Sequence, residues 1–131
     1  MQIRISLKDG VPIYLQIANQ VKYLMASGRL SPGEQLPPVR TLAEDLVINP
    51  NTVARAYREL EREGILVTRR GAGVYVSDAG SPLAKREQKK ILSERVDMLL
   101  AEAEHLNVDL DDLIELINER KKHLKEKEKK P

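Results

Sequence analysis

The chain has 131 residues, of which 22 are Lys or Arg and 20 are Asp or Glu, so its formal net charge is only +2. It has no Cys, which excludes disulfides and thiolate metal sites, and no Trp or Phe, which leaves an aliphatic core with four Tyr at most. No apolar run is long enough to span a membrane and no signal peptide is evident. We therefore expect a cytoplasmic, soluble protein of one domain, or of one domain with an extension.

The first forty residues predict a strand, a helix and a loop. Residues 2–7 alternate between apolar and polar side chains, which predicts a short edge strand. Pro12 suits the first turn of a helix, because its missing N–H is not needed there. Apolar residues follow at helical spacing, and Ser27 with Gly28 ends this helix. The glycine and prolines of residues 30–38 then indicate a fixed turn rather than a flexible linker.

Two more helices follow at short range. Residues 39–46 carry their apolar side chains on one side of a second, short helix. Residues 47–48 are too few to be more than a connection. Asn49 is a good N-cap and Pro50 suits the first helical position, so we expect a third helix that runs to about Arg62. Two helices joined in this way form a helix-turn-helix.

A hairpin is predicted directly after the third helix. The β-rich residues 65–68 and 73–76 flank a tip, residues 69–72, that is made of two arginines, a glycine and an alanine. A hairpin in this position is the wing of a winged helix. Residues 1–78 are therefore predicted to form a winged helix-turn-helix domain, mainly α with a small β-hairpin.

Residues 79–131 predict a short helical tail that serves dimerisation. The tail is highly charged and carries one apolar stripe on two helices, the second of which Asp109 is expected to cap. The stripe is lost over residues 120–131, which are expected to fray. Two helices of this size cannot make a core of their own, so we interpret the stripe as a dimer interface, rather than as a face packed back onto the first helix. The predicted interface residues are Leu92, Val96, Leu99, Leu100, Leu113, Ile114 and Ile117.

The first turn of the third helix carries small polar side chains. In a globular protein, a helix usually has its first apolar core residues there. A recognition helix places this end near the base edges of the major groove. There Asn51 can pair with adenine, and Thr52 can bond a base or touch a thymine methyl. Arg55 and Arg58, one and two turns further on, can reach phosphates or bases. Taken alone, this helix is better explained by ordinary capping and solvated arginines, because cap residues are common.

Basic residues outside the third helix favour DNA. Arg69 and Arg70 at a glycine-flanked tip form a narrow cationic finger that suits the minor groove or its phosphates. Arg40 adds a third basic point in the first turn of the second helix. The ordinary explanation of the hairpin tip is a polar turn, and that of Arg40 is a surface arginine. Together, they favour a DNA-binding surface.

Residues 12–76 resemble the DNA-binding domain of GntR-family transcription regulators. Five segments carry the resemblance in the family's order: residues 32–37 (PGEQLP), 39–43 (VRTLA), 51–53 (NTV), 60–64 (LEREG) and 70–76 (RGAGVYV). The resemblance implies a sequence-specific regulator that binds double-stranded DNA. The DNA contacts that it implies are Arg40, Asn51, Thr52, Arg70, Gly71 and Gly73.

The start of this region and the short tail are similar to the YtrA-type branch of the family. Besides the tail, the similarity lies in residues 12–14 (PIY), 49–53 (NPNTV) and 56–57 (AY). That branch implies a homodimeric repressor, often of its own operon with ABC-transporter genes. The chain departs from the family at Ala54, where many members place Arg, and at Pro50, where a polar or basic residue is common.

Other classes of function find less support. His105 and His123 lie in the charged tail without a Ser or Cys partner motif, and the acids 111–112 suit the first turn of a helix. We therefore expect that the protein is not an enzyme and that it has neither a cofactor nor a metal site. The better rival is a winged helix that contacts another protein and has no DNA operator, although the arginines argue against it. RNA binding is disfavoured by the few aromatics, and a small-molecule effector is compatible with the sequence but not indicated by it.

Overall fold

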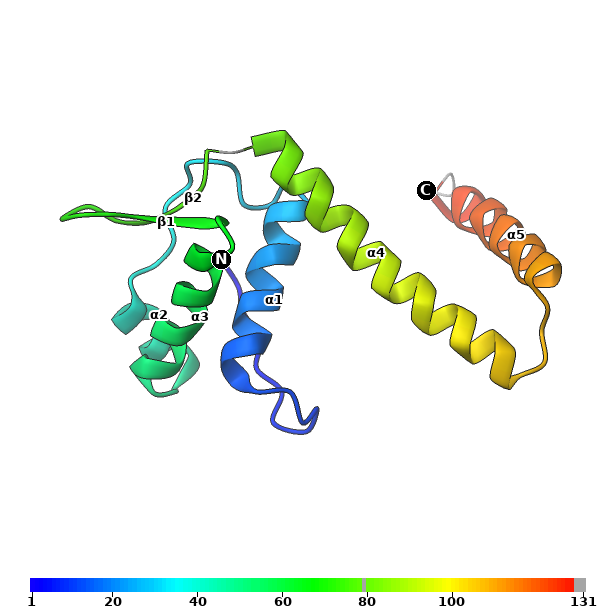
Figure 1. Ribbon diagram of the computed structural model, residues 1–131, viewed down its shortest axis with the longest axis horizontal. Coiled ribbons are helices and arrows are strands. Elements are labelled where there is room, and N and C mark those ends of the chain that lie inside the picture. The colour runs from blue at the N-terminus through cyan, green and yellow to red at the C-terminus, as the bar shows by residue number, and fades with distance from the viewer. Residues whose placement is uncertain (79, 129–131) are drawn as a thin grey trace. The chain divides into compact units, whose positions relative to one another are not determined.

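The computed structural model describes residues 1–78 and 80–128 (Figure 1). The chain divides into two compact units, Met1–Ile91 and a second unit that begins at Leu92. The order of elements confirms the predicted fold class, a mainly α winged helix-turn-helix followed by helices. The elements are α1 (Ile13–Ala26), α2 (Val39–Leu46), α3 (Pro50–Arg62), β1 (Leu66–Arg69), β2 (Gly73–Val76), α4 (Gly80–His105) and α5 (Leu110–Glu128).

The core of the first unit lies between three helices, with α3 in contact with both α1 and α2. Ile17 and Val21 of α1, Leu42 of α2, and Val53 and Leu60 of α3 are all buried in it. These residues recur at helical spacing, so each helix turns one apolar side inward and leaves the other side to solvent. The outward side of α3 is consequently available for function.

Local capping fixes where α3 begins, as predicted. The Asn49 side chain accepts a hydrogen bond from the Asn51 backbone N–H at 2.8 Å, and Pro50 occupies the first turn. Tyr57 then ties the helix to the loop before α2, since its hydroxyl donates to the Pro37 carbonyl at 2.7 Å. Burial raises the pKa of the Tyr57 phenol well above its ordinary value, so the hydroxyl stays protonated and remains a donor.

The predicted hairpin is present and projects from the three helices (Figure 1). Its antiparallel strands pair Leu66 with Val76 and Arg69 with Gly73, so Arg69 lies at the end of β1 rather than in the turn. The loop before α2 supports the hairpin from the side. The Leu36 N–H donates to the Val74 carbonyl at 2.8 Å, and the Val76 N–H donates to the carbonyl of residue 34, also at 2.8 Å.

The edge strand predicted over residues 2–7 is wrong. The segment forms no strand, and two glutamines of α1 pair with its backbone instead of a neighbouring strand. Gln20 binds the Arg4 N–H at 2.9 Å and the Arg4 carbonyl at 2.7 Å. Gln16 does the same for Ser6, at 2.8 and 2.7 Å. A side-chain amide carries one acceptor and two donors, so it can replace the backbone groups of a strand residue.

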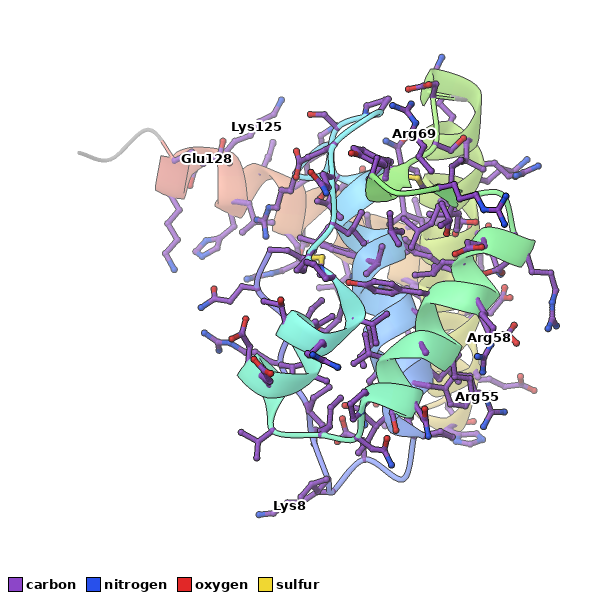
Figure 2. All side chains as sticks on the ribbon, turned by 90° about the vertical axis from the view of Figure 1, so that its left-hand side faces the viewer. Lys8, Arg55, Arg58, Arg69, Lys125 and Glu128 are labelled. Carbon is purple, nitrogen blue, oxygen red and sulfur yellow. The ribbon has the colours of Figure 1, made fainter. Side chains whose placement is uncertain are left out.

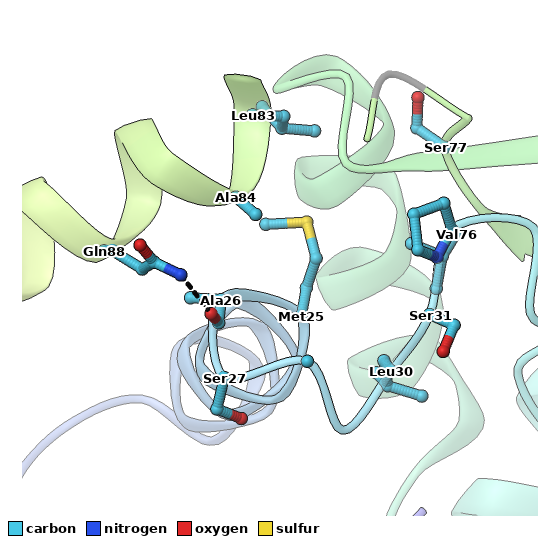
Figure 3. Close-up of a pocket in the computed structure, with 12 residues that line it drawn as sticks. Met25, Ala26, Ser27, Leu30, Ser31, Val76, Ser77, Leu83, Ala84 and Gln88 are labelled. Atoms are coloured by element: carbon cyan, nitrogen blue, oxygen red, sulfur yellow. Dashed lines mark hydrogen bonds between the residues drawn. The ribbon is translucent and has the colours of Figure 1, made fainter. Parts of the chain in front are cut away.

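The first unit extends beyond residue 78, because the start of α4 packs against it. Leu83 and Glu87 are buried there. Gln88 donates from its amide nitrogen to the carbonyl of Ala26 at 2.7 Å (Figure 3). That carbonyl belongs to the last turn of α1, where helix carbonyls lack partners within the helix. The division into a DNA-binding domain that ends at residue 78 and a dimerisation region that follows it stays a prediction.

In the second unit, α4 continues to His105 and the chain turns into α5. Asp109 caps α5 as predicted, accepting a hydrogen bond from the Asp112 N–H at 2.9 Å. The helix extends to Glu128, although we predicted fraying from residue 120. Lys125 and Lys127 in its last turn are favourable to the helix dipole there.

Residues 129–131, the remainder of the fraying prediction, lie outside the described residues. Within the described part of the chain, no helix combines the length and the apolar character of a membrane span.

Candidate nucleic-acid interface

The outward side of α3 carries a row of polar and basic side chains. Its inward residues are buried, and residues spaced by three and four positions share one side of a helix. Four residues that are spaced in this way lie on the opposite, exposed side: Asn51, Arg55, Arg58 and Arg62. Figure 2 shows Arg55 and Arg58 projecting from the same side of α3. Thr52 is half-buried at the margin of this row.

Arg62 was not among the predicted site residues. Its position was readable from the sequence, because it continues the spacing of Asn51, Arg55 and Arg58. The structure places a carboxylate oxygen of Glu59 at 3.4 Å from the Arg62 guanidinium, so part of its charge is already paired.

Arg55 and Arg58 differ from Arg62 in this respect. Among the residues that the structure describes, no carboxylate oxygen lies within salt-bridge distance of either guanidinium. Arg55 instead stacks on an aromatic ring, with its Cζ at 3.8 Å from the centroid of Tyr14. Two cationic side chains therefore remain on the outward side of α3 without an acidic partner.

The acids at the end of α3 are engaged elsewhere. Glu63 forms a salt bridge with Lys22 of α1 at 2.8 Å. Glu61 accepts a hydrogen bond from the hydroxyl of Thr68 on β1. The part of α3 that precedes these acids therefore keeps its basic character, although the chain as a whole is nearly neutral.

The N-terminus of α3 offers the groups that a base-reading helix needs. The backbone N–H of Asn51 is used by the Asn49 cap, whereas the exposed Asn51 side-chain amide has no partner among the described residues. Arg40, exposed at the start of α2, lies near this end of α3, since Arg40, Asn49 and Pro50 line the same shallow hollow. The structure therefore brings together three of the predicted site residues, Arg40, Asn51 and Thr52.

The wing tip depends on glycine. Gly71 and Gly73 have φ angles of 76° and 125°, which other residues rarely adopt. A Cβ on Gly73 would also lie 2.7 Å from the amide nitrogen of Gln35. That nitrogen donates to the Ala72 carbonyl at 3.1 Å, so Gln35 reaches the wing tip because residue 73 has no side chain. Sequence reasoning missed Gln35.

The two wing arginines have different surroundings. Arg70 is exposed in the turn and forms no salt bridge within the described chain. Arg69 stacks on Tyr75, with 4.7 Å between its Cζ and the ring centroid, and lies 3.4 Å from a carboxylate oxygen of Asp78. Arg70 is therefore the more available of the two for a ligand.

The described residues form neither a charged pocket beside the end of α1 nor a metal cluster. A hollow of about 370 Å³ lies between the end of α1, the loop after it and the start of α4 (Figure 3). None of the described residues that line it is charged, so the hollow offers no ionic group to fix a ligand. No three His, Asp or Glu side chains of the described residues cluster closely enough to hold a metal ion.

The apolar stripe of the second unit is largely exposed to solvent. Leu113 is buried together with Ala103. The other six predicted interface residues are exposed, with Leu92 at 60% and Leu99 at 42% of their full accessibility. The exposed six are Leu92, Val96, Leu99, Leu100, Ile114 and Ile117.

Known proteins are similar to this chain in sequence. Residues 13–76 match the profile of the family described as bacterial regulatory proteins, gntR family. Over 117 residues the chain is 41% identical to the HTH-type transcriptional repressor YtrA of Bacillus subtilis (strain 168), with 89% of this chain and 90% of that protein covered.

Solved structures are similar over most of the chain. A GntR family transcriptional regulator from Listeria monocytogenes is 29% identical with a TM-score of 0.77, covering 86% of this chain and 98% of that one. YtrA from Sulfolobus acidocaldarius, a GntR-family transcription factor, is 36% identical with a TM-score of 0.57, covering 76% of this chain and 97% of that one. The chain therefore belongs to the GntR family of bacterial regulatory proteins, and it is a DNA-binding transcription regulator with a winged helix-turn-helix domain.

Proposed function

We propose that the protein is a homodimeric repressor that binds an inverted-repeat operator in double-stranded DNA. The observation that carries the proposal is the outward side of α3, where Asn51 stands at the N-terminus and Arg55 and Arg58 follow without acidic partners. A helix that enters the major groove by its N-terminus needs this order of groups, with slim hydrogen-bonding residues first and cations behind them.

The proposed roles follow from the chemistry of each side chain. Asn51 and Thr52 read base edges, because an amide can pair with adenine in two places and a hydroxyl can bond any base. Arg40, Arg55 and Arg58 neutralise phosphates on either side of the groove. These contacts orient the helix, and the base contacts provide the specificity.

The wing adds contacts beside the groove. Arg70 lies in the turn, and Gly71 and Gly73 allow the backbone to approach the DNA closely. Arg69 can add a phosphate contact by exchanging the Asp78 carboxylate, 3.4 Å away, for a phosphate oxygen. This exchange costs little, because both side chains are more than half exposed.

The test of DNA binding begins with the selection of preferred sequences from a random pool by the purified full-length protein. Asn51→Ala should then cost about 1–3 kcal/mol on the preferred site and little on random DNA. Asn19→Ala is the control, since it removes an exposed amide from α1. Equal losses on all DNA would contradict base reading by Asn51. Failure to enrich any sequence would favour the rival function, a winged helix that contacts another protein.

Dimerisation is proposed from the six exposed apolar residues of the second unit. A single winged module buries little surface on DNA, and joining two modules makes the second contact nearly intramolecular. An isologous dimer has two-fold symmetry, so its operator should be an inverted repeat with half-site centres about 10 bp apart, or a multiple. By similarity to the YtrA-type branch, the proposed target is the protein's own operon with ABC-transporter genes.

The dimer is tested by placing charge in the stripe. The double variant Leu99→Asp with Ile114→Asp should sediment as a monomer and bind an isolated half-site as weakly as a full site. Ala101→Asp is the control for the change on α4, because it adds one negative charge, as Leu99→Asp does, at an exposed position half a turn away. A double variant that stays dimeric, or a monomer that still binds the full operator tightly, would contradict the proposed interface.

A further inference from the structure

We infer that Tyr14 is a positioning residue for DNA binding, whose ring holds the Arg55 guanidinium in place on the outward side of α3. The inference rests on the DNA-contact role that is proposed for Arg55 and adds α1 to the DNA-binding apparatus. It assigns a function to a tyrosine that lies 41 positions before Arg55 in the sequence.

The contact is close and comes from two packed helices. Tyr14 is the second residue of α1 and is half-buried, with its side chain packed against the core. The Arg55 Cζ lies 3.8 Å from the ring centroid, well within the range of a cation–π contact. Because α1 and α3 pack against each other, the ring is a fixed platform rather than a mobile surface group.

This contact orders Arg55 without using up its hydrogen-bond donors. The N–H groups of a guanidinium lie in its plane, so an aromatic ring on one face leaves the edges free for a phosphate. The carboxylates beside Arg62 and Arg69, each at 3.4 Å, occupy such edges instead. Of these three arginines, Arg55 is therefore the one that is both ordered and available.

Ordering before binding strengthens binding. A free arginine side chain gives up rotamer freedom when it binds a phosphate, and a side chain that is already held loses less. Arg58 provides an internal comparison, because it lies one turn further on the same side of α3 and has no aromatic partner in the described residues. Its contribution should not depend on Tyr14.

The experiment is a double-mutant cycle on the full-length protein, with the selected operator and with random DNA. Tyr14→Leu keeps an apolar side chain against the core. It should weaken binding to the selected operator and to random DNA about five-fold, a loss of about 1 kcal/mol in binding free energy. Tyr14→Phe keeps the ring and should bind like the parent. Arg55→Ala should weaken binding at least as much and reduce the salt slope by about 0.9, the value for one phosphate. Tyr14→Leu should have no further effect when Arg55 is already Ala.

The same cycle run with Arg58→Ala is the first control, and the two effects there should add. Tyr23→Leu is the second control, since it makes the same exchange about 13 Å further along α1. Thermal unfolding of each variant shows whether the fold is kept. If Tyr14→Leu does not fold, Arg55→Lys replaces it: losing the planar stack while keeping the charge should also weaken binding about five-fold.

Three results would overturn the inference. Unchanged binding by Tyr14→Leu, or by Arg55→Lys where that variant replaces it, would show that the stack contributes nothing. An equal loss for Tyr14→Phe would assign the effect to the hydroxyl. An effect of Tyr14→Leu that persists in the Arg55→Ala background would show that the ring acts independently of Arg55. Failure of the proposed function is distinguishable, because Asn51→Ala would then also leave binding unchanged.

Discussion

The turn between α2 and α3 predicts a substitution that should stabilise the protein. Val47 has a φ of 54°, in the left-handed region, and the residue is 88% exposed. The N–H of Ile48 donates to the Ala43 carbonyl at 3.0 Å, and that of Val47 to the Glu44 carbonyl at 3.2 Å. This pair of bonds is a Schellman motif, which requires a positive φ at the position of Val47.

Two other helices end with the same hydrogen-bond pattern. Gly64 follows α3 with a φ of 78°, and Asn107 follows α4 with a φ of 57°. Glycine and asparagine are the residues that this conformation tolerates best, whereas a β-branched residue clashes with its own backbone. Val47 is therefore the strained member of three equivalent helix ends.

The change is Val47→Gly. Removing left-handed strain should gain about 1–2 kcal/mol, and the greater freedom of glycine in the unfolded chain should cost about 0.5–1 kcal/mol. Little burial is lost, because the valine side chain is exposed. The free energy of unfolding should therefore rise by roughly 0.5–1 kcal/mol, which corresponds to about 2–5 °C in Tm for a chain of this size. Val47→Asn should also stabilise.

Thermal and urea unfolding at one fixed protein concentration measure this effect, because assembly makes Tm depend on concentration. Gly64→Val is the matched control, since it makes the reverse exchange in the same motif and should destabilise. A decrease in stability for both Val47→Gly and Val47→Asn would refute the argument. It would mean that the valine side chain makes a favourable contact that outweighs its backbone strain.

Two further substitutions test the wing and the anchor of α3. Gly73→Ala should loosen the wing and weaken DNA binding, because the new Cβ would lie 2.7 Å from the Gln35 amide nitrogen at a φ of 125°; hydrogen exchange of the wing and a binding titration measure this. Tyr57→Phe should cost about 0.5–1.5 kcal/mol in urea unfolding, because the hydrogen bond to the Pro37 carbonyl is lost. The raised pKa of Tyr57 favours the folded state fully below its ordinary pKa of 10.0 and progressively less as the pH rises above it. Alkaline destabilisation should therefore be weaker in Tyr57→Phe than in the parent.

The fold was predictable where the deciding signals were local. Asn49 and Asp109 each cap the helix that follows within a few residues, so the starts of α3 and α5 could be read from the sequence. The N-terminal segment could not be read in this way. Its alternation is real, but its backbone is paired by Gln16 and Gln20, which are ordinary polar residues of a helix until the fold brings them there.

In the candidate site too, local spacing was predictable from the sequence and distant partners were not. The spacing from Asn51 through Arg55 and Arg58 was enough to place these residues on one side of α3, and this spacing also contained Arg62. The partners of the site were not readable. Tyr14 and Gln35 reach it from other parts of the chain, and no sequence pattern links them to the residues that they contact.

Salt dependence provides a last prediction, because the arginines differ in whether a carboxylate already pairs with them. Arg40, Arg55, Arg58 and Arg70 have no acidic partner among the described residues. At roughly 0.9 per phosphate contact, these four should give a slope of about −3.6 for one subunit and about −7 for a dimer, in a plot of log affinity against log salt concentration.

Two arginine substitutions in α3, one at an unpaired and one at a paired arginine, provide the control for this slope. Arg58→Ala should reduce the slope of a subunit by about 0.9. Arg62→Ala should reduce it less, because Glu59 already lies 3.4 Å from that guanidinium and is left unpaired when the arginine is removed. A flat salt dependence would contradict phosphate binding altogether. Equal effects of the two substitutions would show that the carboxylate pairing seen in the free protein does not decide which arginines bind DNA.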